Sequence, residues 1–176
     1  MRKTQKLRNK TWLLTFVIAA FCLAVTAVYS AEPGIDVGNK SVDFSLKELS
    51  SNKTFKLSSY ENKNPVLFVF FATWCPYCIA EVSELNKLQS EYSKKGLVIV
   101  SINVQESADK VAGFVKKKKI VNKVLLDSNA EVAKKFKVYG IPTGILVDSK
   151  GVIVFRGNNL PENSDIEKVL PKNKLK

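Results

Sequence analysis

Two cysteines spaced three residues apart, Cys75 and Cys78, are the side chains in this sequence best suited to chemistry. They follow a continuously apolar run, Val66 to Ala72, and precede a segment with helical periodicity. The first turn of a helix offers free N–H groups and partial positive charge, which favour a thiolate over a thiol. Thiolate is the nucleophile of disulfide exchange. The pair therefore predicts a redox-active dithiol, in which Cys75 attacks from an exposed helix start and Cys78, one turn further, resolves the mixed disulfide.

Composition narrows the chemistry further. The chain has 176 residues and is 45% hydrophobic, which suits one domain with a substantial core. It has no histidine, which excludes Cys-His and Ser-His catalysis, histidine-ligated haem and the usual catalytic zinc sites. The third cysteine, Cys22, lies in a hydrophobic leader, so the folded part holds one pair only and its fold must depend on packing.

Two other interpretations of the cysteine pair fit the sequence less well. Half of a zinc site would need two more ligands, which only a second chain sharing the metal would supply, because the domain offers just these two sulfurs. A purely structural disulfide would close almost no loop, so it would remove little entropy from the unfolded chain. Redox exchange fits the spacing better, and we expect neither a metal nor a cofactor.

The first 31 residues have the pattern of a targeting segment. Basic residues from Arg2 to Lys10 precede an uncharged stretch, Thr11 to Ala31. This is either a cleavable signal peptide or an N-terminal membrane anchor. Both place the domain outside the cytoplasm, in a bacterial periplasm or on the outer face of the cytoplasmic membrane, secreted or anchored. The predicted organisation is a leader at 1–31, a linker at 32–40 containing Pro33 and Gly34, and one domain at 41–176.

The net charge of +12 is mostly due to lysine. The run Lys116 to Lys119 is interpreted either as a solvated helix end or as a patch for anionic lipid or an acidic partner. Nucleic acid fits poorly, because no basic stripe is interleaved with aromatic residues.

Hydrophobic periodicity predicts strands alternating with helices, followed by a hairpin, and hence a mixed sheet between helical layers. The predicted helices start at Pro76, Ala108, Ala130 and Asp165, with Ser164 as a cap of the last. The predicted strands are an alternating one at 42–46, a short one at 55–57, and others at 66–72, 97–104, 124–126, 144–147 and 152–155.

Two separated motifs resemble the thioredoxin superfamily, and specifically its exported TlpA/ResA-type (AhpC/TSA-like) thiol:disulfide oxidoreductases. They are Phe68 to Cys78, with Ala80-Glu81 after it, and Val138 to Thr143, followed by Val147 to Gly151. The resemblance covers roughly 42–170. It implies an α/β thioredoxin-like three-layer sandwich, with a central mixed sheet flanked by helices and extra N-terminal strands.

The resemblance also implies roles for other residues. Pro142 matches the family's cis-proline, which packs beside the two sulfurs and would leave the backbone of Ile141 free to pair with a substrate strand. Trp74, Pro76 and Tyr77 would complete the substrate-binding surface beside the redox-active disulfide.

Glu81 matches a family glutamate that takes part in the proton chemistry of the cysteines. A carboxyl desolvated beside two sulfurs should have a raised pKa and can accept the proton of Cys78. Cytosolic thioredoxins hold an acid on the preceding strand, where this chain has Val69, which favours Glu81 in that role. The dipeptide Pro76-Tyr77 also occurs in glutaredoxins, so it does not fix the redox potential.

The predicted function is reduction of disulfides in extracytoplasmic proteins, such as the haem-site cysteines of apocytochrome c or the copper-site cysteines of an oxidase. Its partners would be these substrates and a membrane thiol reductase as electron donor, with membrane association through the N-terminal segment, and we expect a monomer. The alternatives are a thiol peroxidase with antioxidant activity, although Ala72 stands where peroxiredoxins have Thr or Ser, and a non-catalytic metal carrier using the same cysteines.

Overall fold

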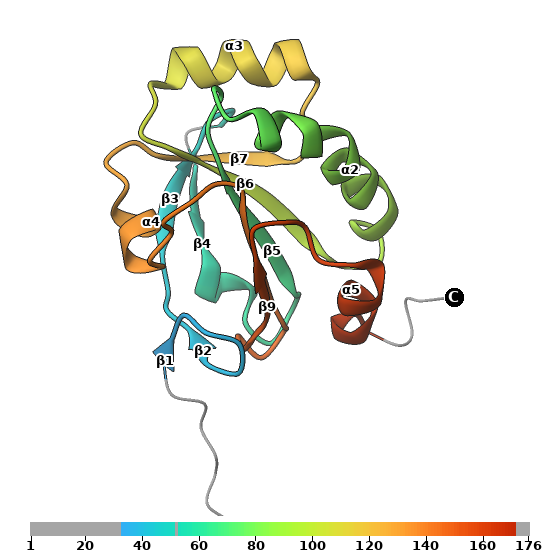
Figure 1. Ribbon diagram of the computed structural model, residues 1–176. Coiled ribbons are helices and arrows are strands. Elements are labelled where there is room, and N and C mark those ends of the chain that lie inside the picture. The colour runs from blue at the N-terminus through green and yellow to red at the C-terminus, as the bar shows by residue number, and fades with distance from the viewer. Residues whose placement is uncertain (1–32, 52, 172–176) are drawn as a thin grey trace, which may run out of the picture. The chain divides into compact units, whose positions relative to one another are not determined.

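The computed structural model describes residues 33–51 and 53–171. Its main sheet has seven strands in the order β4-β3-β7-β6-β5-β8-β9, with helices on both faces (Figure 1). The strands of this sheet are β3 (Ser45–Glu48), β4 (Thr54–Lys56), β5 (Val66–Phe71), β6 (Val98–Val104), β7 (Lys123–Asp127), β8 (Thr143–Val147) and β9 (Ile153–Gly157). The helices are α2 (Pro76–Tyr92), α3 (Ala108–Lys118), α4 (Glu131–Lys135), α5 (Asn163–Val169) and a 3-10 turn at Leu57–Tyr60.

Strand β5 lies at the centre of the fold. All six of its residues are buried, as expected for a strand covered on both faces. It pairs in parallel with β6, Val66 opposite Val98, and antiparallel with β8, Phe70 opposite Thr143. The sheet is therefore mixed, and the predicted thioredoxin-like α/β architecture with helices on both sides is confirmed.

Alternation along β5 divides the core into two layers. Phe68 and Phe70 point to one face and pack around Phe136, which directly follows α4, with ring centroids 5.2 and 6.1 Å away. Leu67 and Val69 point to the other face and join the buried side chains of α2 and α5. Side chains pack closely against both faces of β5. This packing fixes the C-terminal end of the strand, from which the chain continues to Cys75.

The N-terminal part of the described chain differs from the prediction. We expected 32–40 to be a linker, but Pro33–Gly34 and Lys40–Ser41 form a parallel pair, β1 and β2. Their segment is joined to the β8–β9 hairpin by backbone hydrogen bonds, among them Gly38 N–H to Ile153 O at 2.8 Å. Non-local hydrogen bonds of this kind leave no periodicity in the sequence. The predicted leader at 1–31 lies outside the described residues.

Other element boundaries moved as well. The strand expected from Val42 begins only at Ser45, although Phe44 is buried in the core as the alternation required. The last helix begins at Asn163 rather than Asp165, with Glu162 in the capping position and no side-chain cap. Within 33–51 and 53–171, no helix combines the length and apolarity needed to cross a bilayer.

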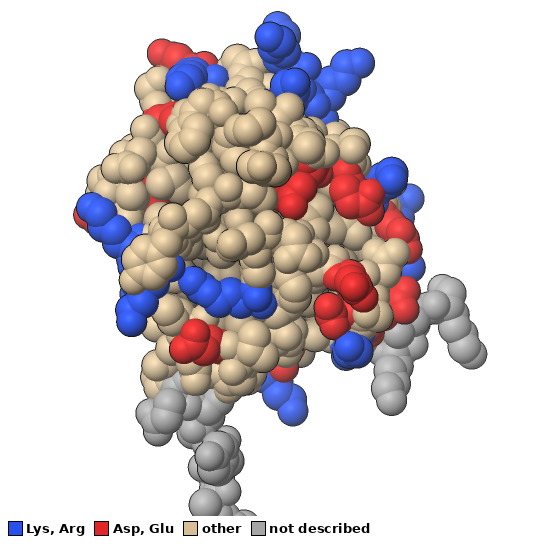
Figure 2. Space-filling view, viewed as in Figure 1, with Lys and Arg blue, Asp and Glu red and all other residues tan. Residues whose placement is uncertain are grey.

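The lysine run occupies the end of α3. Lys116, Lys117 and Lys118 form its last turn, and Lys119 ends it in the left-handed conformation, with a φ of 55°. Cations at a helix C-terminus interact favourably with the partial negative charge there. Figure 2 shows blue side chains standing out from the surface at this end of α3.

Candidate redox site

Cys75 and Cys78 form a disulfide at the start of α2, with their Cα atoms 5.3 Å apart. Cys75 is the N-cap of the helix and Pro76 occupies its first turn, where a missing N–H costs nothing. The backbone N–H of Cys78 donates to Cys75 Sγ at 3.1 Å. In the reduced protein the same N–H would stabilise a thiolate on Cys75, so this end of α2 is suited to activating that sulfur.

Exposure around the disulfide differs from the prediction in one respect. Cys75, expected at an exposed position, is only 2% exposed, and Cys78 is 6% exposed. Their neighbours Trp74 and Tyr77 are 68% and 74% exposed. The disulfide is therefore buried, while the aromatic side chains next to it in the chain are exposed. Cys75 is buried because it packs in the hydrophobic cluster under α3.

The second motif meets the first at the sulfur. The Ile141–Pro142 peptide bond is cis, which confirms that prediction. The carbonyl oxygen of Ile141 lies 3.6 Å from Cys75 Sγ. Pro142 is buried and Ile141 half-buried. Residues separated by 66 positions in the chain thus form the two sides of one site.

Glu81 lies beside the second cysteine. Both line a small cavity of about 20 Å³, together with Val69, Ser101 and Pro142. That volume has room for about one water molecule. Burial raises the pKa of the Glu81 carboxyl, as the sequence predicted. Cys78 and the Glu81 carboxyl, whose proton affinity is raised, thus border the same cavity.

Two residues that the sequence did not single out also belong to the surroundings of the disulfide. Tyr139 is 92% exposed and, with Trp74, lines an open hollow of about 550 Å³. Glu106 follows β6, and its side chain is only 4% exposed. Its carboxylate accepts a hydrogen bond from the backbone N–H of Thr73, the residue immediately before Trp74. The sequence feature that could have pointed to Tyr139 is its position next to Gly140-Ile141-Pro142. The feature that could have pointed to Glu106 is an acidic residue directly after a buried strand that neighbours β5.

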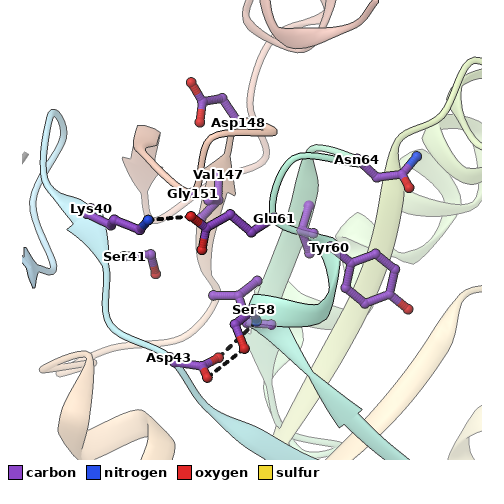
Figure 3. Close-up of a pocket in the computed structure, with 12 residues that line it drawn as sticks. Lys40, Ser41, Asp43, Ser58, Tyr60, Glu61, Asn64, Val147, Asp148 and Gly151 are labelled. Carbon is purple, nitrogen blue, oxygen red and sulfur yellow. Dashed lines mark hydrogen bonds and ion pairs between the residues drawn. The ribbon is translucent and has the colours of Figure 1, made fainter. Parts of the chain in front are cut away.

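A second pocket, of about 100 Å³, lies at the opposite end of β5, near Val66 (Figure 3). Its polar groups bond to one another: Lys40 pairs with Glu61, and the backbone N–H and hydroxyl of Ser58 donate to Asp43 at 2.9 and 2.8 Å. These contacts join the 3-10 turn to the segment around β2. Across the described ranges 33–51 and 53–171, no cluster of three metal-ligating side chains occurs.

Comparison with known proteins agrees with this geometry. The Redoxin family model matches residues 36–170. The chain is 29% identical over 171 residues to the thiol-disulfide oxidoreductase ResA of Geobacillus kaustophilus, covering 97% of each. It is 35% identical over 133 residues to the thiol:disulfide interchange protein DsbE of Haemophilus influenzae, covering 75% of this chain and 69% of that protein.

Solved structures show the same fold. A thiol:disulfide interchange protein of the thioredoxin family from Chlorobium tepidum superposes with a TM-score of 0.62 at 24% identity, covering 79% of this chain and 94% of that one. A thioredoxin domain from Bacteroides vulgatus gives a TM-score of 0.66 at 19% identity, covering 80% and 100%. The chain therefore belongs to the Redoxin family and is a thiol-disulfide oxidoreductase of the ResA and DsbE type within the thioredoxin superfamily.

Proposed function

We propose that this protein reduces disulfides in extracytoplasmic proteins by cycling Cys75 and Cys78 between dithiol and disulfide. The observation that carries the proposal is the position of the pair. One sulfur caps α2 and accepts the N–H of Cys78, while the cis-proline loop borders it at 3.6 Å. Both sulfurs and the carboxyl beside them come from one chain, which supports the expected monomer as the working form.

The reaction has two exchange steps. The Cys75 thiolate attacks one sulfur of the substrate disulfide, forming a mixed disulfide, and the other substrate sulfur leaves as a thiolate that takes up a proton. Cys78 then loses its proton and attacks Cys75 Sγ. This closes the Cys75–Cys78 disulfide and releases the second substrate thiolate. The second substrate thiolate also takes up a proton, so the substrate gains two electrons and two protons. The protein supplies both electrons, and the two protons match the one that Cys75 gave to solvent when it ionised and the one that Cys78 loses in the second step.

Glu81 would serve in the second step. Cys78 must be deprotonated before it can attack, and it is nearly buried, so bulk water is a poor acceptor. The raised pKa of Glu81, caused by burial, brings its proton affinity closer to that of a thiol. Their shared cavity of about 20 Å³ has room for a single water to carry the proton between them.

The substrate would bind over the aromatic side chains around the disulfide. Trp74, Tyr77 and Tyr139 are all more than two-thirds exposed, which is unusual for large aromatic residues. The hollow between Trp74 and Tyr139 reaches Ile141, whose backbone would pair with an extended substrate strand.

The expected setting is the outside of the cytoplasmic membrane, with residues 1–31 as a signal peptide or anchor. A membrane thiol reductase would return two electrons to the Cys75–Cys78 disulfide after each cycle. The substrates we favour are the haem-site cysteines of apocytochrome c and the copper-site cysteines of an oxidase. A peroxidase role finds no support at Ala72, which is buried and has no hydroxyl to bind a peroxide.

Insulin reduction with dithiothreitol as electron donor tests the proposal. Wild-type protein should accelerate precipitation of the insulin B chain, and Cys75→Ser should abolish that acceleration. Cys78→Ser should form a mixed disulfide with insulin that is visible by intact mass. Full activity in Cys75→Ser would overturn the proposal, as would consumption of hydrogen peroxide by the reduced protein at a rate far above its insulin reduction.

A further inference from the structure

A buried carboxylate lies directly behind the chain segment that leads to Cys75. Glu106 follows β6, the parallel neighbour of β5, so the ends of both strands reach the same edge of the sheet. Thr73 follows β5 at that edge, two residues before Cys75. The Glu106 side chain is 4% exposed. Burying a charge this deeply is costly unless its partners are complete.

The partners of Glu106 are complete. Its Oε2 accepts the backbone N–H of Thr73 and the side-chain amide of Asn103, each at 2.7 Å. Its Oε1 accepts the Thr73 hydroxyl at 2.6 Å and the Lys110 ammonium at 2.7 Å. An ionised carboxylate has about four acceptor positions, and here all of them face donors. Burial alone would raise the pKa of Glu106, but the bonds from Lys110, Thr73 and Asn103 outweigh it and hold the pKa at about 2.

Two of these four bonds hold one residue, Thr73, by its backbone and its side chain together. The next turn of the chain closes through the Cys75 N–H, which donates to Ala72 O at 3.2 Å. The contact between Cys75 Sγ and the Cys78 N–H depends on where that turn places the sulfur. Fixing Thr73 therefore fixes the entry of the chain into α2.

We infer that Glu106 is a positioning residue for Cys75: by clamping Thr73 it holds the attacking sulfur at the α2 N-terminus and so maintains its reactivity near neutral pH. The inference rests on the proposed function, because reactivity of Cys75 is what it explains. Looseness of about 1 Å in such a supporting contact is enough to impair a site.

Two substitutions of Glu106 distinguish its hydrogen bonds to Thr73 from its negative charge. In Glu106→Gln the amide oxygen can still accept from Thr73 N–H and Asn103, while the amide nitrogen donates to the Thr73 hydroxyl, which can rotate to accept. Lys110 is 56% exposed and can turn into solvent. The glutamine variant thus keeps the clamp and loses the charge, whereas Glu106→Ala loses both.

The two roles predict opposite results for the ionisation of Cys75. If Glu106 positions the sulfur, Glu106→Ala lets it leave the Cys78 N–H, and the pH at which Cys75 is half-ionised rises. If Glu106 acted only through its negative charge, its removal would favour the thiolate, and that pH would fall in both variants.

The experiment measures the rate of Cys75 alkylation by iodoacetamide against pH in the full-length reduced protein. In Glu106→Ala, the rate at pH 7 should fall about tenfold and the profile should move to higher pH, while Glu106→Gln stays within about twofold of wild type. The reduction potential against glutathione should become more negative in Glu106→Ala alone, because its reduced form loses thiolate stabilisation.

Asp43 supplies the matched control at the far end of β5. Its carboxylate also accepts a backbone N–H and a hydroxyl from one residue, Ser58, and also pairs with a lysine, Lys56, at 3.7 Å. Asp43→Ala should lower the melting temperature without moving the alkylation profile. If it moves that profile as Glu106→Ala does, the effect is general loosening and the inference fails.

Other results are equally decisive. An unchanged or lower half-ionisation pH in folded Glu106→Ala overturns the inference. If Glu106→Ala does not fold, Thr73→Val and Thr73→Ser replace it: loss of reactivity in valine with retention in serine supports the clamp, and equal reactivity in both contradicts it. Insulin reduction by the wild type is measured alongside, so failure of the proposed function is seen independently of the Glu106 variants.

Discussion

Acidification should weaken the wild-type protein more than Glu106→Gln, because a buried and fully hydrogen-bonded carboxylate has to be protonated. The pKa of Glu106 is about 2 in the folded protein, against 4.5 for an ordinary glutamate. A group whose pKa is lower in the folded state stabilises that state above its unfolded pKa, and this contribution disappears as the pH falls through the folded value. The stabilising contribution of Glu106 is therefore lost in the pH window from about 4.5 down to about 2.

The magnitude follows from the same two values. Their difference is about 2.5, and each pKa unit corresponds to about 1.36 kcal/mol, so the contribution of Glu106 is about 3 kcal/mol. Its side chain is only 4% exposed, so solvent screening reduces this little. A small domain has a total stability of about 5–15 kcal/mol, which makes the loss readily measurable.

Urea denaturation of both proteins between pH 7 and pH 2, followed by tryptophan fluorescence, measures the effect. The other carboxyl groups are common to both proteins, so their titration cancels in the difference between the two unfolding free energies. That difference should shrink by about 3 kcal/mol across the window, in favour of Glu106→Gln. A difference that stays constant from pH 7 to pH 2 would refute the assignment of a buried, ionised Glu106.

Three further changes probe other parts of the molecule. Glu81→Gln should leave the attack by Cys75 unchanged but slow the resolving step, so quenched-flow samples should accumulate mixed disulfide. In the wild type, the resolving step should become faster as Glu81 loses its proton. This should occur at a pH above 4.5, because burial raises the pKa of Glu81. Tyr139→Ala should raise KM for a protein disulfide several-fold with kcat nearly unchanged, since its ring is 92% exposed and lines the hollow proposed to bind the substrate. Leu88→Ala should cost about 2–5 kcal/mol in urea denaturation, because this side chain is 2% exposed in the core.

The parts of the fold that the sequence predicted are those with local signals. Strand β5 is an unbroken apolar run, and α2 repeats its apolar residues every three or four positions after Pro76. The helix predicted to start at Ala108 does start there, and its lysine-rich end at Lys118 carries the positive charge that suits a helix C-terminus. The Ile141-Pro142-Thr143 motif gave the cis bond by resemblance.

The remaining features depend on contacts between distant parts of the chain. β1 and β2 are two residues each and exist through bonds to the β8–β9 hairpin, so no period reveals them. The clamp on Thr73 arises only once β5 and β6 pair in parallel and bring Glu106 to the same edge. The burial of Cys75 likewise follows from packing under α3, which motif spacing does not encode.

The most direct test of the account is the ionisation of Cys75 in the reduced wild-type protein. Alkylation rates measured from acid to alkaline pH, with the labelled cysteine identified by peptide mass, give the pH at which this sulfur is half-ionised. The account predicts that Cys75 is labelled before Cys78 and is half-ionised well below about 8.5, the value for an unperturbed cysteine. Preferential labelling of Cys78, or half-ionisation of Cys75 at or above that value, would contradict it.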